Sequence, residues 1–305
     1  MALVLDPHLS KAPSLPLSRK TASIFVALVF FCILALGLID YAAQRKTDAF
    51  SVQAISARHK SDPSFATSAL PPAEEAELKQ ALSQSYSYLA CGAQTHVFVS
   101  QDGAYVIKFF KQRLYHPCLI DHLRKGRVLK KAEKLRRDFM SYKAAFETLP
   151  EETGVLYLHL LPTDHLKTNL QIYDKNHRDY TLFLDDFEFI IQRRAERAQD
   201  RLYALLSAGK KEEAKTACRS LFALIAARAK KGFCDRDPDI GNNCGFLGDK
   251  AIKLDVGRLV KDPKMVNSIR EEIAQIALPF RAWIAWAFPS FLAEFDEELA
   301  KACEI

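Results

Sequence analysis

Ten residues in the second half of the chain, CDRDPDIGNN (234–243), concentrate oxygen-bearing side chains. Asp235, Asp237 and Asp239 stand at two-residue steps, and Asn242 follows a glycine. Carboxylate and amide oxygens at this density could bind calcium, support phosphoryl transfer, or simply form a polar turn. These three alternatives differ in the neighbouring residues that each requires.

The calcium alternative requires more than three spaced carboxylates. An EF-hand loop places oxygens at positions 1, 3 and 5, a glycine at position 6 and a bidentate glutamate at position 12. If Asp235 is position 1, then position 6 is Ile240 and position 12 is Phe246. The sharp turn and the bidentate ligand are both missing, so the sequence argues against a calcium loop.

Phosphoryl transfer needs a carboxylate that orients the attacking hydroxyl and oxygen ligands that hold magnesium at the phosphates. Asp237 is followed five residues later by Asn242, which is the D-x-x-x-x-N spacing of a kinase catalytic loop. Asp255 begins an Asp-apolar-Gly triplet directly after a short apolar run. Asp237 is therefore a candidate base, and Asn242 and Asp255 are candidate magnesium ligands.

A candidate phosphate-binding lysine lies in the first half of the chain. Lys108 belongs to AYVIKFF, which matches the V-A-I-K type of strand. The preceding run, THVFVS, is also rich in β-branched and aromatic residues, and Asp102-Gly103 separates the two runs. This pattern predicts a β-hairpin with Lys108 on its second strand.

The segment before this hairpin, LACGAQTHVF, aligns with a glycine-rich loop that covers phosphates. Gly92 falls on the second glycine of that loop, and Val97 falls on the valine that would contact the base. Ala90 and Thr95 replace the first and third glycines. Their side chains restrict positive φ angles and the close approach of the backbone to a phosphate.

Together these pieces resemble the protein-kinase-like superfamily over about residues 86–260. Asp-Arg-Asp (235–237) stands where that family has His-Arg-Asp, and Asp-Val-Gly (255–257) stands where it has Asp-Phe-Gly. The resemblance implies that the protein uses ATP and Mg²⁺. It also implies that a carboxylate from the next helix, Glu133 or Asp138, orients the lysine.

The C-terminal region departs from a protein kinase. Only 48 residues follow Gly257, and they include no Ala-Pro-Glu and no activation segment rich in serine or threonine. Asp239 replaces the lysine usual in protein-serine/threonine kinases. The chain thus resembles minimal kinases of sugars or lipopolysaccharide core, which implies phosphoryl transfer to a sugar or glycolipid hydroxyl. The alternative is a catalytically inactive pseudokinase that acts as a membrane-anchored scaffold.

Hydrophobic patterning predicts an α+β protein with two lobes, a bilobal kinase-like fold with a short C-lobe. Helices are expected after Pro72 and over 124–147, 186–206 and 210–230. GVLYLHLL (154–161), LQIYD, YTLFLD and AIKLDV are expected strands.

A run of 18 uncharged residues, 22–39, predicts a transmembrane helix near the N-terminus, because about 20 apolar residues cross a bilayer. A cleaved signal peptide and a buried helix are the alternatives. In chain order, the predicted segments are an N-terminal tail (1–21), the transmembrane helix (22–39), a linker (40–75), an N-lobe (76–187) and a C-lobe (188–305). A slight excess of basic residues after the span predicts a single-pass membrane protein with a cytoplasmic kinase-like domain.

The overall composition limits the classes of partner. The 43 basic and 37 acidic residues give a net charge of +6, which suits an anionic ligand or a membrane surface. No nucleic-acid-binding motif is present, and the seven cysteines contain no Cys-x-x-Cys pair. The expected partners are therefore a nucleotide, a membrane, and a lipid-linked sugar or a protein, but not nucleic acid.

Overall fold

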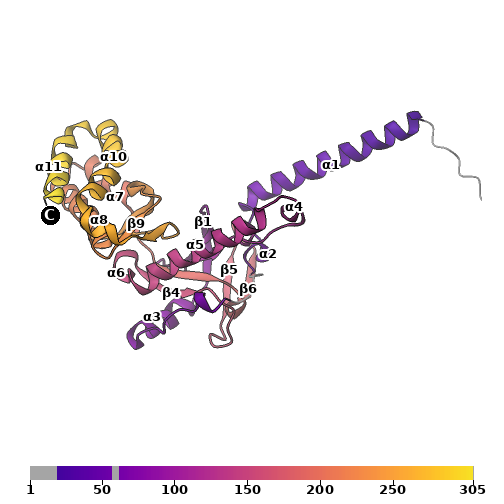
Figure 1. Ribbon diagram of the computed structural model, residues 1–305, viewed down its shortest axis with the longest axis horizontal. Helices are drawn as coiled ribbons and strands as arrows, with labels where there is room; N and C mark the ends of the chain where they lie inside the picture. Colours follow the sequence, from indigo (N-terminus) through magenta and orange to yellow (C-terminus); the bar gives the residue numbers. More distant parts are fainter. Residues whose placement is uncertain (1–18, 57–61, 305) are drawn as a thin grey trace, which may run out of the picture. The chain divides into compact units, whose positions relative to one another are not determined.

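The computed structural model describes residues 19–56 and 62–304. The chain divides into two compact units, residues 1–49 and 50–305. Helix α1 (Arg19–Thr47) belongs to the first unit, and the sheets and the other helices belong to the second (Figure 1). Residues 1–18 of the predicted tail and 57–61 of the predicted linker lie outside the described residues.

The apolar run near the N-terminus forms a helix, α1, as expected from its composition. However, no helix within residues 19–56 and 62–304 is both long enough and apolar enough to cross a bilayer. A spanning helix needs about 20 consecutive, predominantly apolar residues. The prediction of a transmembrane helix over 22–39 is therefore wrong, and so is the single-pass membrane localisation that followed from it.

The second unit is built on a seven-stranded sheet with the strand order β4-β7-β3-β2-β1-β5-β6. Every neighbouring pair is antiparallel except β1 and β5, which run parallel. The strands, in chain order, are β1 (Tyr86–Cys91), β2 (Thr95–Ser100), β3 (Tyr105–Phe110), β4 (Val155–His159), β5 (Asn169–Tyr173), β6 (Asp179–Phe183) and β7 (Phe189–Arg193). The hairpin β5–β6 lies in sequence between β4 and β7 but extends the sheet beyond β1.

Strands β2 and β3 form the hairpin predicted at Asp102-Gly103, where Gly103 has a φ of +73°. That conformation is open to glycine because it has no Cβ. Side chains on β3 alternate between two cores: Ile107 and Phe109 pack on one face, and Phe110 packs on the other. Lys108 therefore shares the face of Phe110.

Helix α5 (Arg127–Glu147) covers this second face of the sheet. Its buried apolar side chains, Phe139, Tyr142, Ala145 and Phe146, pack in the same core as Phe110. Helix α3 (Pro72–Leu82) supplies Leu78 and Ala81 to the core on the opposite face. The helices predicted after Pro72 and over 124–147 are thus confirmed, and they bracket the sheet.

The C-terminal part is mainly helical. Helices α7 (Ala198–Ser207), α8 (Lys211–Lys230), α10 (Ile269–Ala287) and α11 (Leu292–Cys303) pack around one apolar core, and α8, α10 and α11 are seen near the C-terminus in Figure 1. The predicted helix over 186–206 is wrong in its first half, because residues 189–193 form β7 of the large sheet.

Small strands and turns connect these helices and carry the expected catalytic segments. Strand β10 pairs with β8 and β11, and β9 pairs with β12. These strands are β8 (Glu196–Arg197), β9 (Phe233–Asp235), β10 (Cys244–Leu247), β11 (Lys250–Lys253) and β12 (Leu259–Lys261). The short α-helices are α2 (Val52–Ile55), α4 (Leu119–His122), α6 (Pro150–Thr153) and α9 (Ile240–Asn243). The 3₁₀ turns are η1 (Pro63–Phe65), η2 (Gln112–Leu114), η3 (Leu184–Asp186), η4 (Pro263–Asn267) and η5 (Pro289–Phe291).

Candidate active site

A cleft of about 780 Å³ is lined both by the sheet and by the segments around α9 and β11. This volume lies in the range of roughly 300–1,000 Å³ that is usual for small-molecule sites. The predicted site residues that line the cleft are Gly92, Val97, Lys108, Asn242 and Asp255. Residues that are far apart in the sequence therefore come together in one place.

Lys108 reaches across the cleft from β3. Its Nζ donates a hydrogen bond of 2.8 Å to the backbone oxygen of Leu254, the residue before Asp255. Burial lowers the pKa of Lys108 to about 8, and the negative charge of Asp255 acts in the opposite direction. The lysine is thus held at the segment that carries the candidate metal ligand.

The structure does not bring Glu133 or Asp138 to Lys108. Glu133 is exposed on α5. Asp138 is buried, but its carboxylate pairs with two cations of its own helix, with Lys134 Nζ at 2.5 Å and Arg137 Nη2 at 2.9 Å. The carboxylate of Asp138 is therefore already neutralised within α5, and neither candidate orients the lysine.

Helix α5 instead presents Tyr142 to the cleft. The Tyr142 hydroxyl donates a hydrogen bond of 3.1 Å to Oε1 of Gln94, which comes from the loop between β1 and β2. A Cβ at Gly257 would lie only 2.1 Å from the same Gln94 oxygen. The glycine of the Asp-Val-Gly triplet is thus required for the phosphate-loop glutamine to reach α5.

Ser141, the neighbour of Tyr142, fixes α5 to the Asp-Val-Gly segment. Its Oγ donates a 2.5 Å hydrogen bond to the Val256 oxygen and accepts one of 2.7 Å from the Leu259 amide. Asp255 Oδ1 in turn accepts a hydrogen bond of 3.1 Å from the Gly257 amide. The segment around Asp255 is therefore held by α5 and by a hydrogen bond within the triplet itself.

The loop that leads to Asn242 contains Asp237, which is not among the residues that line the cleft. Its side chain is exposed, and its carboxylate makes no hydrogen bond or ion pair with the described residues. Its backbone is firmly held: the amide donates to Asp235 Oδ1 at 2.9 Å, and the carbonyl accepts from Asn243 Nδ2 at 3.0 Å and Lys253 Nζ at 3.1 Å. A fixed peptide with an unengaged carboxylate is suited to accepting a proton.

Two adjacent amides line the cleft beside this loop. Asn242 Nδ2 donates 2.8 Å to Asp239 Oδ2, whose carboxylate also caps α9. Asn243 bonds the Asp237 carbonyl, and its own backbone oxygen accepts from the Leu254 amide at 2.7 Å. Asn243 thus links the loop to the strand that leads to Asp255.

Among the cleft-lining residues that sequence reasoning missed are Gln94, Tyr142 and Asn243. The repeated asparagine at 242 and 243 was a visible signal, because either residue could follow the loop carboxylate at nearly the same distance. Gln94 and Tyr142 carried no comparable signal. Their importance depends on the rotation of α5 about its axis, which the spacing of motifs does not give.

No family model matches the sequence, and no curated protein matches it. Among solved structures, the chain is similar to WbdD bound to the kinase inhibitor LY294002, with a TM-score of 0.35 and 15% identity over 72% of this chain and 46% of that one. It is also similar to the bifunctional kinase-methyltransferase WbdD (TM-score 0.34, 14% identity, 70% and 43% coverage). A third match is the Rv3197–erythromycin complex from Mycobacterium tuberculosis (TM-score 0.31, 14% identity, 84% and 74% coverage).

The chain spans less than half of each of these WbdD chains. Since all these TM-scores lie below 0.5, the kinase-like assignment rests on the features of this chain. Four features meet at one cleft: a lysine on the third strand of an N-terminal sheet, a helix after that strand, the asparagine of an Asp-x-x-x-x-Asn loop and the aspartate of an Asp-x-Gly segment. The fold is kinase-like and α+β.

Proposed function

We propose that this protein is a phosphotransferase that moves the γ-phosphoryl group of ATP to a hydroxyl group of a sugar or glycolipid. The observation that carries the proposal is the meeting of Lys108, Asn242 and Asp255 in one cleft of suitable size. A cation and two oxygen ligands are the groups that phosphoryl transfer requires at the phosphates.

In this proposal Lys108 binds the α- and β-phosphates, and Gly92 and Val97 cover the nucleotide. Asn242 and Asp255 would hold Mg²⁺, which supplies charge neutralisation at the phosphates when bound. Both offer oxygen, the donor that magnesium prefers. Within residues 19–56 and 62–304, no three His, Cys, Asp or Glu side chains gather as a metal site. That fits an ion whose remaining ligands are water and phosphate.

Asp237 is the proposed base. Its carboxylate is exposed and unengaged, so it can accept the proton of an acceptor hydroxyl while its peptide stays fixed. Catalysis would come mainly from placing the hydroxyl in line with the phosphate and from neutralising charge.

The segment after the Asp-Val-Gly triplet favours a small acceptor over a protein. Directly after the triplet, residues 259–261 pair with β9. Residues 263–267 then form η4, and α10 begins at Ile269. The described chain thus has no extended segment here on which a peptide could lie. Asp239, in the position of the lysine usual in protein kinases, is engaged as the cap of α9.

Two measurements test the proposal. The full chain should melt at a higher temperature with Mg·ATP, because ligand at ~100 times its Kd adds about 2.7 kcal/mol of stability. ADP release should increase with glycolipid or sugar acceptors and not with protein acceptors. Turnover on proteins alone would rule out the proposed acceptor class.

The second candidate function is a pseudokinase scaffold that binds a partner without chemistry. Two observations favour it: α5 supplies no carboxylate to Lys108, and Ala90 and Thr95 replace two glycines of the phosphate loop. An unchanged melting temperature in saturating Mg·ATP would support the scaffold over the enzyme.

A further inference from the structure

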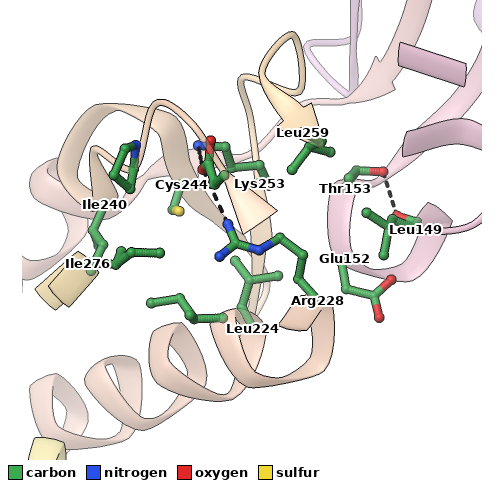
Figure 2. Close-up of a pocket in the computed structure, with 13 residues that line it drawn as sticks. Leu149, Glu152, Thr153, Leu224, Arg228, Ile240, Cys244, Lys253, Leu259 and Ile276 are labelled. Carbon is green, nitrogen blue, oxygen red and sulfur yellow. Dashed lines mark hydrogen bonds and ion pairs between the residues drawn. The ribbon is translucent and has the colours of Figure 1, made fainter. Parts of the chain in front are cut away.

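Three charged side chains meet below the Asp237 loop, namely Arg228 on α8, Asp235 on β9 and Lys253 on β11. We refer to them as the loop anchor. Figure 2 shows Arg228 extending from its helix toward Lys253, with apolar residues around both. Asp235 Oδ2 lies 2.5 Å from Lys253 Nζ and 3.3 Å from Arg228 Nη1. One carboxylate therefore bridges two cations that come from different elements.

The loop anchor is almost completely removed from water. The side chains of Arg228, Asp235 and Lys253 are 6%, 2% and 5% exposed. The surrounding cavity is lined by apolar side chains, among them Leu224, Ile240, Leu259 and Ile276. Burying charges in such surroundings is unfavourable unless they are paired and hydrogen-bonded. A cluster of this kind is weak support for stability, so its contacts suggest another role.

The charges balance once one more residue is counted. Arg228 Nη2 also pairs with Glu272 Oε1 on α10 at 2.5 Å. Two cations and two carboxylates then form a neutral group that connects α8, β9, β11 and α10. The group is a rigid support for the loop, because moving one charge would leave another buried without its partner.

The loop anchor contacts the Asp237 peptide on both sides. Asp235 Oδ1 accepts the Asp237 amide at 2.9 Å, and Lys253 Nζ donates to the Asp237 carbonyl at 3.1 Å. Lys253 lies on the strand that leads to Asp255, and its own carbonyl accepts a bond of 3.0 Å from Gln192 Nε2 on β7. The same lysine thus connects the Asp237 loop, the segment that leads to Asp255 and the large sheet.

We infer that Asp235 and Lys253 are positioning residues that fix the Asp237 peptide, so that its carboxylate faces the acceptor, with Arg228 neutralising Asp235. The loop-holding role is independent of catalysis, whereas its effect on turnover rests on the proposed phosphotransferase function. Lys253→Met should loosen the loop, because it removes one of the two donors to the Asp237 carbonyl and leaves only Asn243 Nδ2, while Arg228 still pairs with Asp235.

Full-length variants are compared by hydrogen exchange and by the steady-state kinetics of ADP release from Mg·ATP. Lys253→Met should speed exchange in residues 233–243 and lower kcat by roughly 10²-fold, the cost of a misplaced catalytic group, with little change in KM for ATP. Lys253→Arg should recover part of kcat. Lys250→Met is the matched control, since Lys250 lies on the same strand but pairs with exposed Glu151.

A double variant, Asp235→Asn with Lys253→Met, removes one charge of each sign. It replaces Lys253→Met in the same two measurements if the single variant does not fold. Faster loop exchange with reduced kcat supports the inference. Wild-type exchange in a folded Lys253→Met protein, or an unchanged kcat, overturns it. If the wild-type chain releases no ADP, the proposed function fails, while loop exchange in the same variants still decides whether the anchor holds Asp237.

Discussion

The two walls of the cleft differ in how they are built. On the C-terminal wall, Asn242 and Asp255 line the cleft at kinase-like spacing from Asp237, and partly buried polar contacts fix the backbone of Asp237. On the sheet wall, Lys108 stands where the spacing predicts, but no carboxylate of α5 reaches it. Chain spacing sets the positions of groups within one short loop, whereas a pair between a strand and a helix also depends on how the helix is rotated.

The largest expected effect comes from the C-terminal wall. Asp255→Ala removes a proposed magnesium ligand, so turnover should fall by roughly 10²–10³-fold, the usual effect of losing one group that stabilises developing charge. The increase in melting temperature caused by Mg·ATP should also disappear. Asp249→Ala is the control, because Asp249 is exposed and pairs with Arg201. If Mg·ATP raised the melting temperature of Asp255→Ala as much as that of wild type, Asp255 would not be a magnesium ligand, and the C-terminal wall would not hold the metal as proposed.

On the sheet wall, Lys108 should make activity depend on pH. With its pKa at about 8, the ammonium is lost as pH rises past that value, so kcat/KM for ATP should fall about tenfold per pH unit above 8. Lys108→Met should have low activity without this decline. An unchanged profile between pH 7 and 9.5 would contradict a phosphate-binding role.

The same group affects stability in the opposite direction. The pKa of Lys108 is lowered from its ordinary value of 10.5, so the unfolded chain binds more protons between about pH 8 and 10.5. The contribution of this group to the free energy of unfolding therefore rises with pH across that window. Urea denaturation at pH 7.5 and 10 measures the free energy of unfolding of wild type and Lys108→Met. The increase with pH that Lys108 contributes in wild type should be missing from the variant.

A smaller effect is expected at the contact that replaces a lysine–carboxylate pair. Tyr142→Phe removes the hydroxyl that bonds Gln94 and should lower the free energy of unfolding by about 1 kcal/mol, the net worth of one buried hydrogen bond. Mg·ATP should still raise the melting temperature. If the variant is as stable as wild type in urea denaturation, the Tyr142–Gln94 bond does not link α5 to the phosphate loop.

The smallest effect is expected at Glu133. Because this side chain is exposed and is not part of the cleft lining, Glu133→Gln should change stability by no more than about 0.5 kcal/mol and leave the Mg·ATP shift intact. A weakened shift would mean that α5 rotates to bring Glu133 to Lys108 when nucleotide binds.

Much of the fold followed from local sequence. The β2–β3 hairpin was predicted because β-branched runs flank Asp102-Gly103, and α8 was predicted from its helical spacing. Residues 189–193 were misassigned as helix. Four of them, Phe189–Gln192, are fully buried in β7, between β3 and β4. A short apolar run buried on both faces has no alternation, so periodicity could not separate strand from helix.

The site was predictable to the extent that it is local. Spacing placed Lys108, Asn242 and Asp255 at one cleft, but it could not show that Asp138 would be neutralised by Lys134 and Arg137 on its own helix. Nor could it show that Tyr142 would face Gln94. Both outcomes depend on the packing of α5 against the sheet, which a single sequence encodes only through many weak contacts.

The β5–β6 hairpin has a consequence for how the protein folds. It places β5 parallel to β1 and pairs Tyr86 with Ile172, two residues from distant parts of the chain. The intervening chain must be brought round before this pairing can form, and contacts of such long sequence separation slow folding. The strand that leads into the phosphate loop is therefore expected to complete its pairing late, after the local β2–β3 hairpin, during synthesis as well as refolding.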